Sequence, residues 1–206
     1  MGQAAAGMQR VPVLLAIYPG IKALEAVGPL GVLASANRHL AAKGLAGGYD
    51  VSIAAPVPGE IRTDTPAAIR AETGLPQEGP LDTVILAGSA GIEAALESET
   101  VLVDWCRRRA PGARRFAALC TGSLLLAAAG LLAGRRAATH WAYAGLLRQR
   151  FPGVEVDADA IFVEDGNLWT SAGVTAAIDL TLAFVEQDFG RQVALDVARD
   201  MVVYLK

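Results

Sequence analysis

Apolar runs alternate along the chain with segments of helical spacing. Residues 11–17, 82–87 and 116–119 are short and largely apolar, which is typical of strands that a sheet buries on both faces. Residues 49–55 alternate and predict another strand, and a helix is predicted over about 24–43. Strands that alternate with helices predict an α/β fold whose mostly parallel, flavodoxin-like sheet is flanked by helices on both faces.

The second half of the chain continues this alternation. Helical spacing covers 99–109, 141–151 and the segment after Gly122, while 56–80 predicts only short strands and loops. Asp165-Gly166 predicts the turn of a small β-hairpin with strands at 161–164 and 167–170. Two final helices are predicted from the apolar positions Ile178, Leu182, Val185 and Phe189, and then Val193, Val197 and Met201, with Gly190 between them.

Composition restricts the class of protein. We expect residues 1–10 to be a flexible leader and 11–206 a single domain, because the chain has no repeat or long linker. A net charge of −3 with 53% hydrophobic residues favours a well-buried domain, not a nucleic-acid binder. The basic runs Arg107–Arg109 and Arg114–Arg115 are expected to be solvated surface. No apolar stretch is long enough to span a membrane, and two cysteines suit a reducing cytoplasm.

The segment 116–123 carries the candidate chemistry. A strand runs directly into Cys120, Thr121 and Gly122, and a helix follows, which is the order of a nucleophile elbow. Such a tight turn strains the backbone of Cys120 and lifts its side chain to the carboxyl edge of the sheet, where α/β folds bind ligands. The helix amino terminus favours a thiolate there. Alternatively, Cys120 is a small buried hydrophobic residue, and that is what we expect of Cys106, in mid-helix.

Two groups could serve as proton partner of Cys120. Glu25 follows the first strand and should lie at the same sheet edge, where burial would favour its protonated form. It could equally be an acid placed for the helix dipole. His140, at a predicted helix start, is expected to cap or pack more than to catalyse, and to line the ligand pocket. Oxyanion donors are expected from the backbone of Thr121 and from the loop of Gly88, Ser89 and Ala90. We expect no metal and no cofactor.

Several motifs together resemble one superfamily. They are Cys120–Leu124, Ala129–Arg136, Thr139–Trp141, Leu168–Gly173 and Val185–Gly190, with weaker pieces between them. The chain resembles the ThiJ/PfpI superfamily, with the class I glutamine-amidotransferase-like fold, and within it the amino-terminal domains of AraC-type transcription regulators. The resemblance implies a homodimer, a cysteine pocket at Cys120 and a match of Glu25 to the family's acidic residue. In isocyanide hydratases Asp is usual at that position, and the family often has Gly-Gly where this chain has Gly88-Ser89.

Three functions follow from the resemblance. The first is a ligand- or redox-sensing, dimerising domain of a regulator, which would bind an unknown small molecule and reach DNA only through a helix-turn-helix region that these 206 residues do not contain. The alternative is an isocyanide hydratase in which Cys120 attacks the substrate and Glu25 delivers a proton. A hydrolase is disfavoured, because those relatives carry histidine where this chain has Thr121. Whether the chain is an enzyme stays open at this point, with the sensing domain favoured.

Overall fold

A seven-stranded sheet forms the centre of the computed structural model, which describes residues 10–203. In chain order its strands are β1 (Val11–Ala16), β2 (Tyr49–Ala55), β5 (Thr73–Gly74), β6 (Thr83–Leu86), β7 (Arg115–Ala118), β10 (Phe162–Asp165) and β11 (Leu168–Ser171). In space they follow the order β10-β11-β7-β6-β1-β2-β5. All neighbours are parallel except β10 and β11, which form the antiparallel hairpin. The predicted α/β class and mostly parallel sheet are confirmed.

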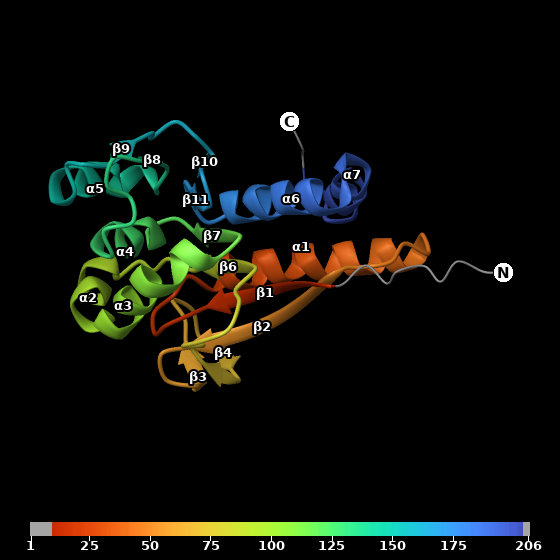
Figure 1. The fold of residues 1–206 in the computed structure, drawn as a ribbon, viewed down its shortest axis with the longest axis horizontal. Coiled ribbons are helices and arrows are strands. Elements are labelled where there is room, and N and C mark those ends of the chain that lie inside the picture. The colour runs from red at the N-terminus through yellow and green to blue at the C-terminus, as the bar shows by residue number, and fades with distance from the viewer. Residues whose placement is uncertain (1–9, 204–206) are drawn as a thin grey trace.

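Helices cover both faces of this sheet (Figure 1). The helices α1 (Ala23–Ala42), α6 (Ala176–Phe189) and α7 (Arg191–Asp200) pack on one another on one face. On the other face, α4 (Gly122–Ala128) contacts both α2 (Ile92–Ser98) and α3 (Thr100–Arg109). Smaller elements complete the fold: β3 (Gly59–Arg62) pairs with β4 (Ala68–Ala71), β8 (Arg136–Ala137) pairs with β9 (Glu155–Val156), and η1 (Ala110–Gly112), η2 (Trp141–Tyr143) and α5 (Ala144–Arg150) lie between strands.

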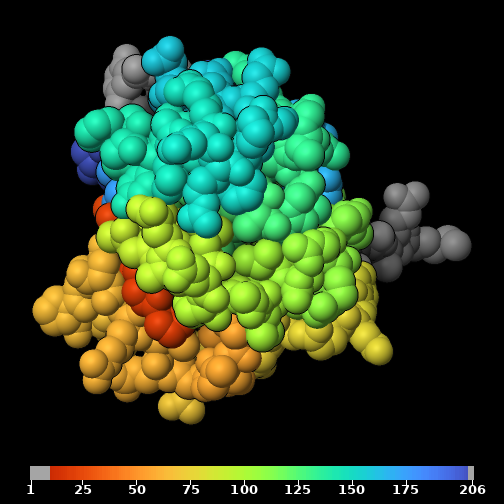
Figure 2. All heavy atoms as spheres, turned by 90° about the vertical axis from the view of Figure 1, so that its left-hand side faces the viewer, coloured from red at the N-terminus to blue at the C-terminus, as the bar shows by residue number. Residues whose placement is uncertain are grey.

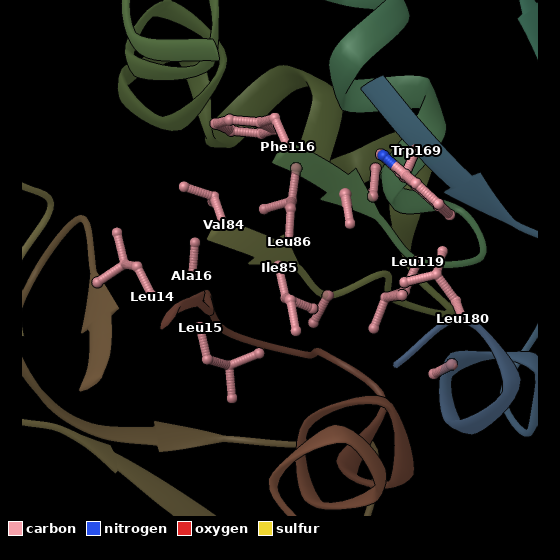
Figure 3. Packing of buried hydrophobic residues seen from close by; sticks show 14 of the residues in the cluster. Leu14, Leu15, Ala16, Val84, Ile85, Leu86, Phe116, Leu119, Trp169 and Leu180 are labelled. Carbon is pink, nitrogen blue, oxygen red and sulfur yellow. The ribbon is translucent and has the colours of Figure 1, made fainter. Parts of the chain in front are cut away.

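The core lies above and below the central strands (Figure 3). Because successive strand residues point to opposite faces, Leu15 and Ile85 point toward α1, while Val84, Leu86 and Phe116 point to the other side. All five side chains are fully or almost fully buried. This two-sided burial explains why β1, β6 and β7 read as apolar runs in the sequence.

Three local predictions need correction. The helix α2 was not foreseen, because Ile92–Ser98 is short and follows a glycine-containing loop. The hairpin turn falls on Gly166 and Asn167, one residue later than predicted, since Asp165 pairs with Leu168 and Gly166 takes the positive φ of 63°. Arg115 is not solvated surface: it is 3% exposed and pairs with Asp188 at 2.5 Å.

The carboxyl ends of the parallel strands share one end of the molecule, which faces the viewer in Figure 2. There the red segment after β1 reaches the surface between orange and yellow-green segments. The predicted leader lies outside the described residues, apart from Arg10. Among the helices of residues 10–203, none combines the length and apolar character needed to cross a membrane.

Candidate functional site

Cys120 lies in the turn that joins β7 to α4. Its φ of 51° is in the left-handed region, which only one other non-glycine residue among those described enters. The turn is held from several sides: the Cys120 N–H donates to the Ser171 carbonyl at 3.0 Å, and the Cys120 carbonyl accepts from Ser123 Oγ and Thr139 Oγ1. The surrounding fold therefore imposes the strained conformation that the elbow prediction requires.

Two glycines make room for this turn. An added Cβ on Gly122 would lie 3.2 Å from the carbonyl oxygens of Leu86 and Ala87. On Gly88 it would lie 2.7 Å from Thr121 Oγ1 and 2.8 Å from the Leu119 carbonyl oxygen. Side chains at these two positions would push β6 and the elbow apart, so the close approach depends on glycine.

Glu25, in the first turn of α1, is brought to the same place. Its side chain is fully buried, and its Oε2 accepts a hydrogen bond from the Gly88 N–H at 2.7 Å. The other oxygen, Oε1, has no partner of regular hydrogen-bond geometry among the described residues, although the carboxyl interacts with the Cys120 thiol. The structure therefore brings together the two residues proposed as nucleophile and proton partner.

Burial controls the protonation of this Cys120–Glu25 pair. Removal from water raises the pKa of Glu25 above its ordinary value. Burial, followed by the nearby Glu25 carboxyl, raises the pKa of Cys120 to about 12, against the opposing effect of the Thr121 N–H. With Glu25 ionised, Cys120 is thus a neutral thiol, not the free thiolate expected from the helix terminus alone. A proton that moves from sulfur to carboxylate creates the nucleophile without adding a second charge.

Two of the expected oxyanion donors are engaged elsewhere. The Gly88 N–H binds Glu25, and the Ser89 N–H donates to Thr121 Oγ1 at 2.9 Å, while that hydroxyl donates to the Ser89 carbonyl at 2.7 Å. The Ala90 carbonyl accepts from the Tyr143 hydroxyl at 2.9 Å. The Thr121 N–H is directed to the sulfur of Cys120, so this donor is available at the reacting atom.

His140 caps η2, as the sequence indicated. Its Nδ1 accepts from the Ala142 N–H at 3.3 Å, and burial lowers its pKa, with a smaller contribution from Lys22. It also lines a hollow of about 380 Å³ together with Trp141, Ile161 and Gly173, among others. Two residues connect this hollow to the elbow. Thr139 and Ser171 form hydrogen bonds with the backbone of Cys120, and each directly precedes a residue that lines the hollow.

Three residues near the elbow were not singled out in the sequence. Thr139 supports the elbow, and Tyr18 and Ser171 place buried hydroxyl groups at the same sheet edge. The available signal was position, because Tyr18 follows β1 and Ser171 ends β11, at carboxyl ends of parallel strands. Cys106, by contrast, is buried within α3 as expected, and burial raises its pKa. Within residues 10–203, no cluster of three His, Cys, Asp or Glu side chains is arranged to hold a metal ion.

Comparisons with known proteins identify the family of the chain. The model of the DJ-1/PfpI family matches residues 9–187. An isonitrile hydratase of Pseudomonas putida is 37% identical over 177 residues, which cover 84% of this chain and 70% of that protein. The HTH-type transcriptional regulator GbdR of Pseudomonas aeruginosa is 32% identical over 136 residues, 66% of this chain but only 36% of the regulator.

Solved structures show the same fold. A ThiJ/PfpI family protein from Pseudomonas syringae superposes with a TM-score of 0.80 at 24% identity, over 100% of this chain and 83% of the other. The chain thus spans most of the hydratase and about a third of the regulator.

Proposed function

The chain belongs to the DJ-1/PfpI family, and from that premise we propose that it is an isonitrile hydratase in which Cys120 is the nucleophile and Glu25 moves the proton. The observation that carries this proposal is the buried Glu25 carboxyl beside a cysteine at positive φ. The match to the hydratase covers 70% of that protein, whereas the match to the regulator GbdR covers 36% of the regulator. The comparisons thus favour this alternative over the sensing domain that the sequence analysis put first.

The reaction uses the charge state of the pair. The Glu25 carboxylate takes the thiol proton as the sulfur of Cys120 attacks the terminal carbon of R–N≡C, and it returns that proton to the same carbon. The product is a thioimidate, S–CH=N–R. Water adds to this carbon, and one of its protons goes to nitrogen. Cleavage of the C–S bond then releases the N-formamide, R–NH–CHO, and a proton returns to sulfur through Glu25. The net reaction consumes one water molecule.

The glutamate at position 25 fits this scheme despite its extra methylene. Its Oε2 accepts a hydrogen bond from the Gly88 N–H, and the same carboxyl interacts with the Cys120 thiol. The substituent R would occupy the hollow beside His140 and Trp141. Because Cys120 has no exposed surface, neighbouring side chains must move to admit the substrate.

Turnover is the test. The protein is incubated with benzyl isonitrile, and the N-formamide is measured by mass spectrometry. We expect formation by the unaltered protein, loss in Cys120→Ala, and a rate lower by about a hundredfold or more in Glu25→Gln. The matched control is Cys106→Ala, which removes the other buried cysteine away from the site and should retain turnover. Turnover that persists in Cys120→Ala would contradict the mechanism.

A second candidate is the sensing domain of an AraC-type regulator. The regulators GbdR and CdhR of Pseudomonas aeruginosa, at 32% and 38% identity over parts of the chain, favour it. In that case the turnover assay yields no N-formamide, and the protein binds a small molecule saturably without converting it. The reading frame that follows the codon of Lys206 would then encode a helix-turn-helix region.

A further inference from the structure

Tyr18 carries a hydroxyl group that the core does not explain. The side chain is fully buried, and its oxygen is one of three buried side-chain polar atoms in residues 10–203 without a regular hydrogen-bond partner. The other two, Glu25 Oε1 and Ser171 Oγ, belong to the site already described. A phenylalanine would fill the same volume without the cost of an unpartnered polar group. The hydroxyl therefore calls for a role outside packing.

The sheet places Tyr18 beside the reacting pair. In β1 and β6, Ala16 pairs with Leu86, so Tyr18 lies level with the segment that follows β6. On the other side of β6, Leu86 pairs with Ala118, and Cys120 stands two residues further on. Tyr18 and Cys120 therefore flank the same short segment, Gly88-Ser89, whose first N–H holds Glu25.

The charges around the site make a donor useful there. The phenol of Tyr18 interacts with the side chain of Ser89, whose hydrogen-bonding effect opposes the rise in its pKa, and it interacts electrostatically with Glu25, Glu99 and Cys120. Lys22 and Asp64, which pair with each other at 3.7 Å, also act on Glu25, and Lys22 acts on His140. Burial raises the pKa of Tyr18, so the hydroxyl keeps its proton and acts as a donor. A nearby negative charge strengthens the hydrogen bond that it donates.

We propose that Tyr18 is a positioning residue whose hydroxyl donates a hydrogen bond, directly or through one water molecule, to the negative charge of the Cys120–Glu25 pair. Beyond the end of β1 the hydroxyl lies near the Ser89 side chain without a partner of regular hydrogen-bond geometry, and the proposed bond forms as that charge develops and the side chains move to admit a reactant. Without this donor the negatively charged form of the Cys120–Glu25 pair is less stable, so the pKa of Glu25 rises further. Only the effect on turnover rests on the proposed hydratase function.

Tyr18→Phe isolates the hydroxyl. The titration of the Glu25 carboxyl is followed by carbon-13 NMR, with its resonance assigned from Glu25→Gln. We expect it to move to higher pH in Tyr18→Phe, and kcat/KM for benzyl isonitrile at neutral pH to fall on the order of tenfold. The melting temperature should be unchanged or higher, because the variant loses an unpartnered polar group.

Tyr49→Phe is the matched control. Tyr49 is equally buried, but its hydroxyl donates to Asp188 at 3.0 Å, at the other end of the strands. Its loss should lower stability and leave the Glu25 titration unmoved. If the Glu25 titration does not move in Tyr18→Phe, the inference is overturned. If the melting temperature also falls, the hydroxyl has a structural role instead. Absence of turnover in the unaltered protein defeats the hydratase proposal alone, since the titration needs no turnover.

Discussion

At Cys120 a single torsion angle decides what the side chain can do. With φ at 51°, the residue leaves the line of β7 before α4 begins, and its sulfur meets the carboxyl of a helix about a hundred residues earlier in the chain. In a regular strand or helix the same cysteine would be one more small core residue, like Cys106. The backbone, more than the residue type, distinguishes the two cysteines.

The ionisation of Glu25 predicts an acid limb in the rate. As the general base, Glu25 acts in its ionised form, so turnover should be present above its pKa and lost as the pH falls through it. Because burial raises that pKa, the loss should begin above the ordinary carboxyl range. The measurement is kcat/KM for benzyl isonitrile against pH. A rate independent of pH down to the ordinary carboxyl range would exclude Glu25 as the base.

Stability provides the control for this prediction. A raised pKa means that the folded protein binds the proton of Glu25 more tightly than the unfolded chain. Its contribution to stability is therefore full below the unfolded value and is lost as the pH rises through the folded value. Glu25→Gln removes that loss, so urea unfolding near neutral pH should show it at least as stable as the unaltered protein. Its lower turnover would then not reflect unfolding.

At the scale of elements, the elbow depends on how closely β6 approaches the turn after β7. In Gly88→Ala the new Cβ would lie 2.7 Å from Thr121 Oγ1 and 2.9 Å from the Thr121 N, so the turn must shift. We expect a loss of about 1–3 kcal/mol in the free energy of unfolding, together with a clear loss of turnover. Urea denaturation and the formamide assay measure the two effects.

Gly91 offers a matched control in the same loop. A Cβ there would meet no atom within 4 Å, and its φ of −93° suits any residue. Gly91→Ala should therefore change neither stability nor turnover appreciably. Equal losses in both variants would mean that the loop tolerates no substitution, and that the contact with Thr121 is not the cause.

At the scale of the whole molecule, a buried ion network joins the opposite end of the sheet to α6. Arg115 donates to Thr83 Oγ1 and to Asp188, and it lies 4.2 Å from the centre of the Phe184 ring. Asp188 also accepts from Arg114 and Tyr49. The network ties β2, β6 and β7 to a helix that the sequence places far from them.

Removing one partner of this network should be costly. Asp188→Ala leaves the Arg115 charge buried without its carboxylate, and we expect a loss of about 3–5 kcal/mol in the free energy of unfolding. Guanidinium denaturation checks this. The control is Glu186→Ala, which breaks the exposed pair with Arg191 and should cost less than about 1 kcal/mol. Similar values for both would show that Arg115 finds water or another acceptor.

By itself, the sequence determined the order of the strands and helices apart from α2, the two-sided burial of the sheet, the elbow at Cys120 and the cap at His140. These depend on local spacing and on short-range turn chemistry, which neighbouring residues encode. Tertiary structure alone decided the bond of Glu25 to Gly88, the use of the Ser89 N–H by Thr121, the buried state of Arg115 and the buried hydroxyl of Tyr18. Each of these joins segments distant in the chain, and the packing of the sheet edge, which no local pattern records, sets which polar groups find partners and which do not.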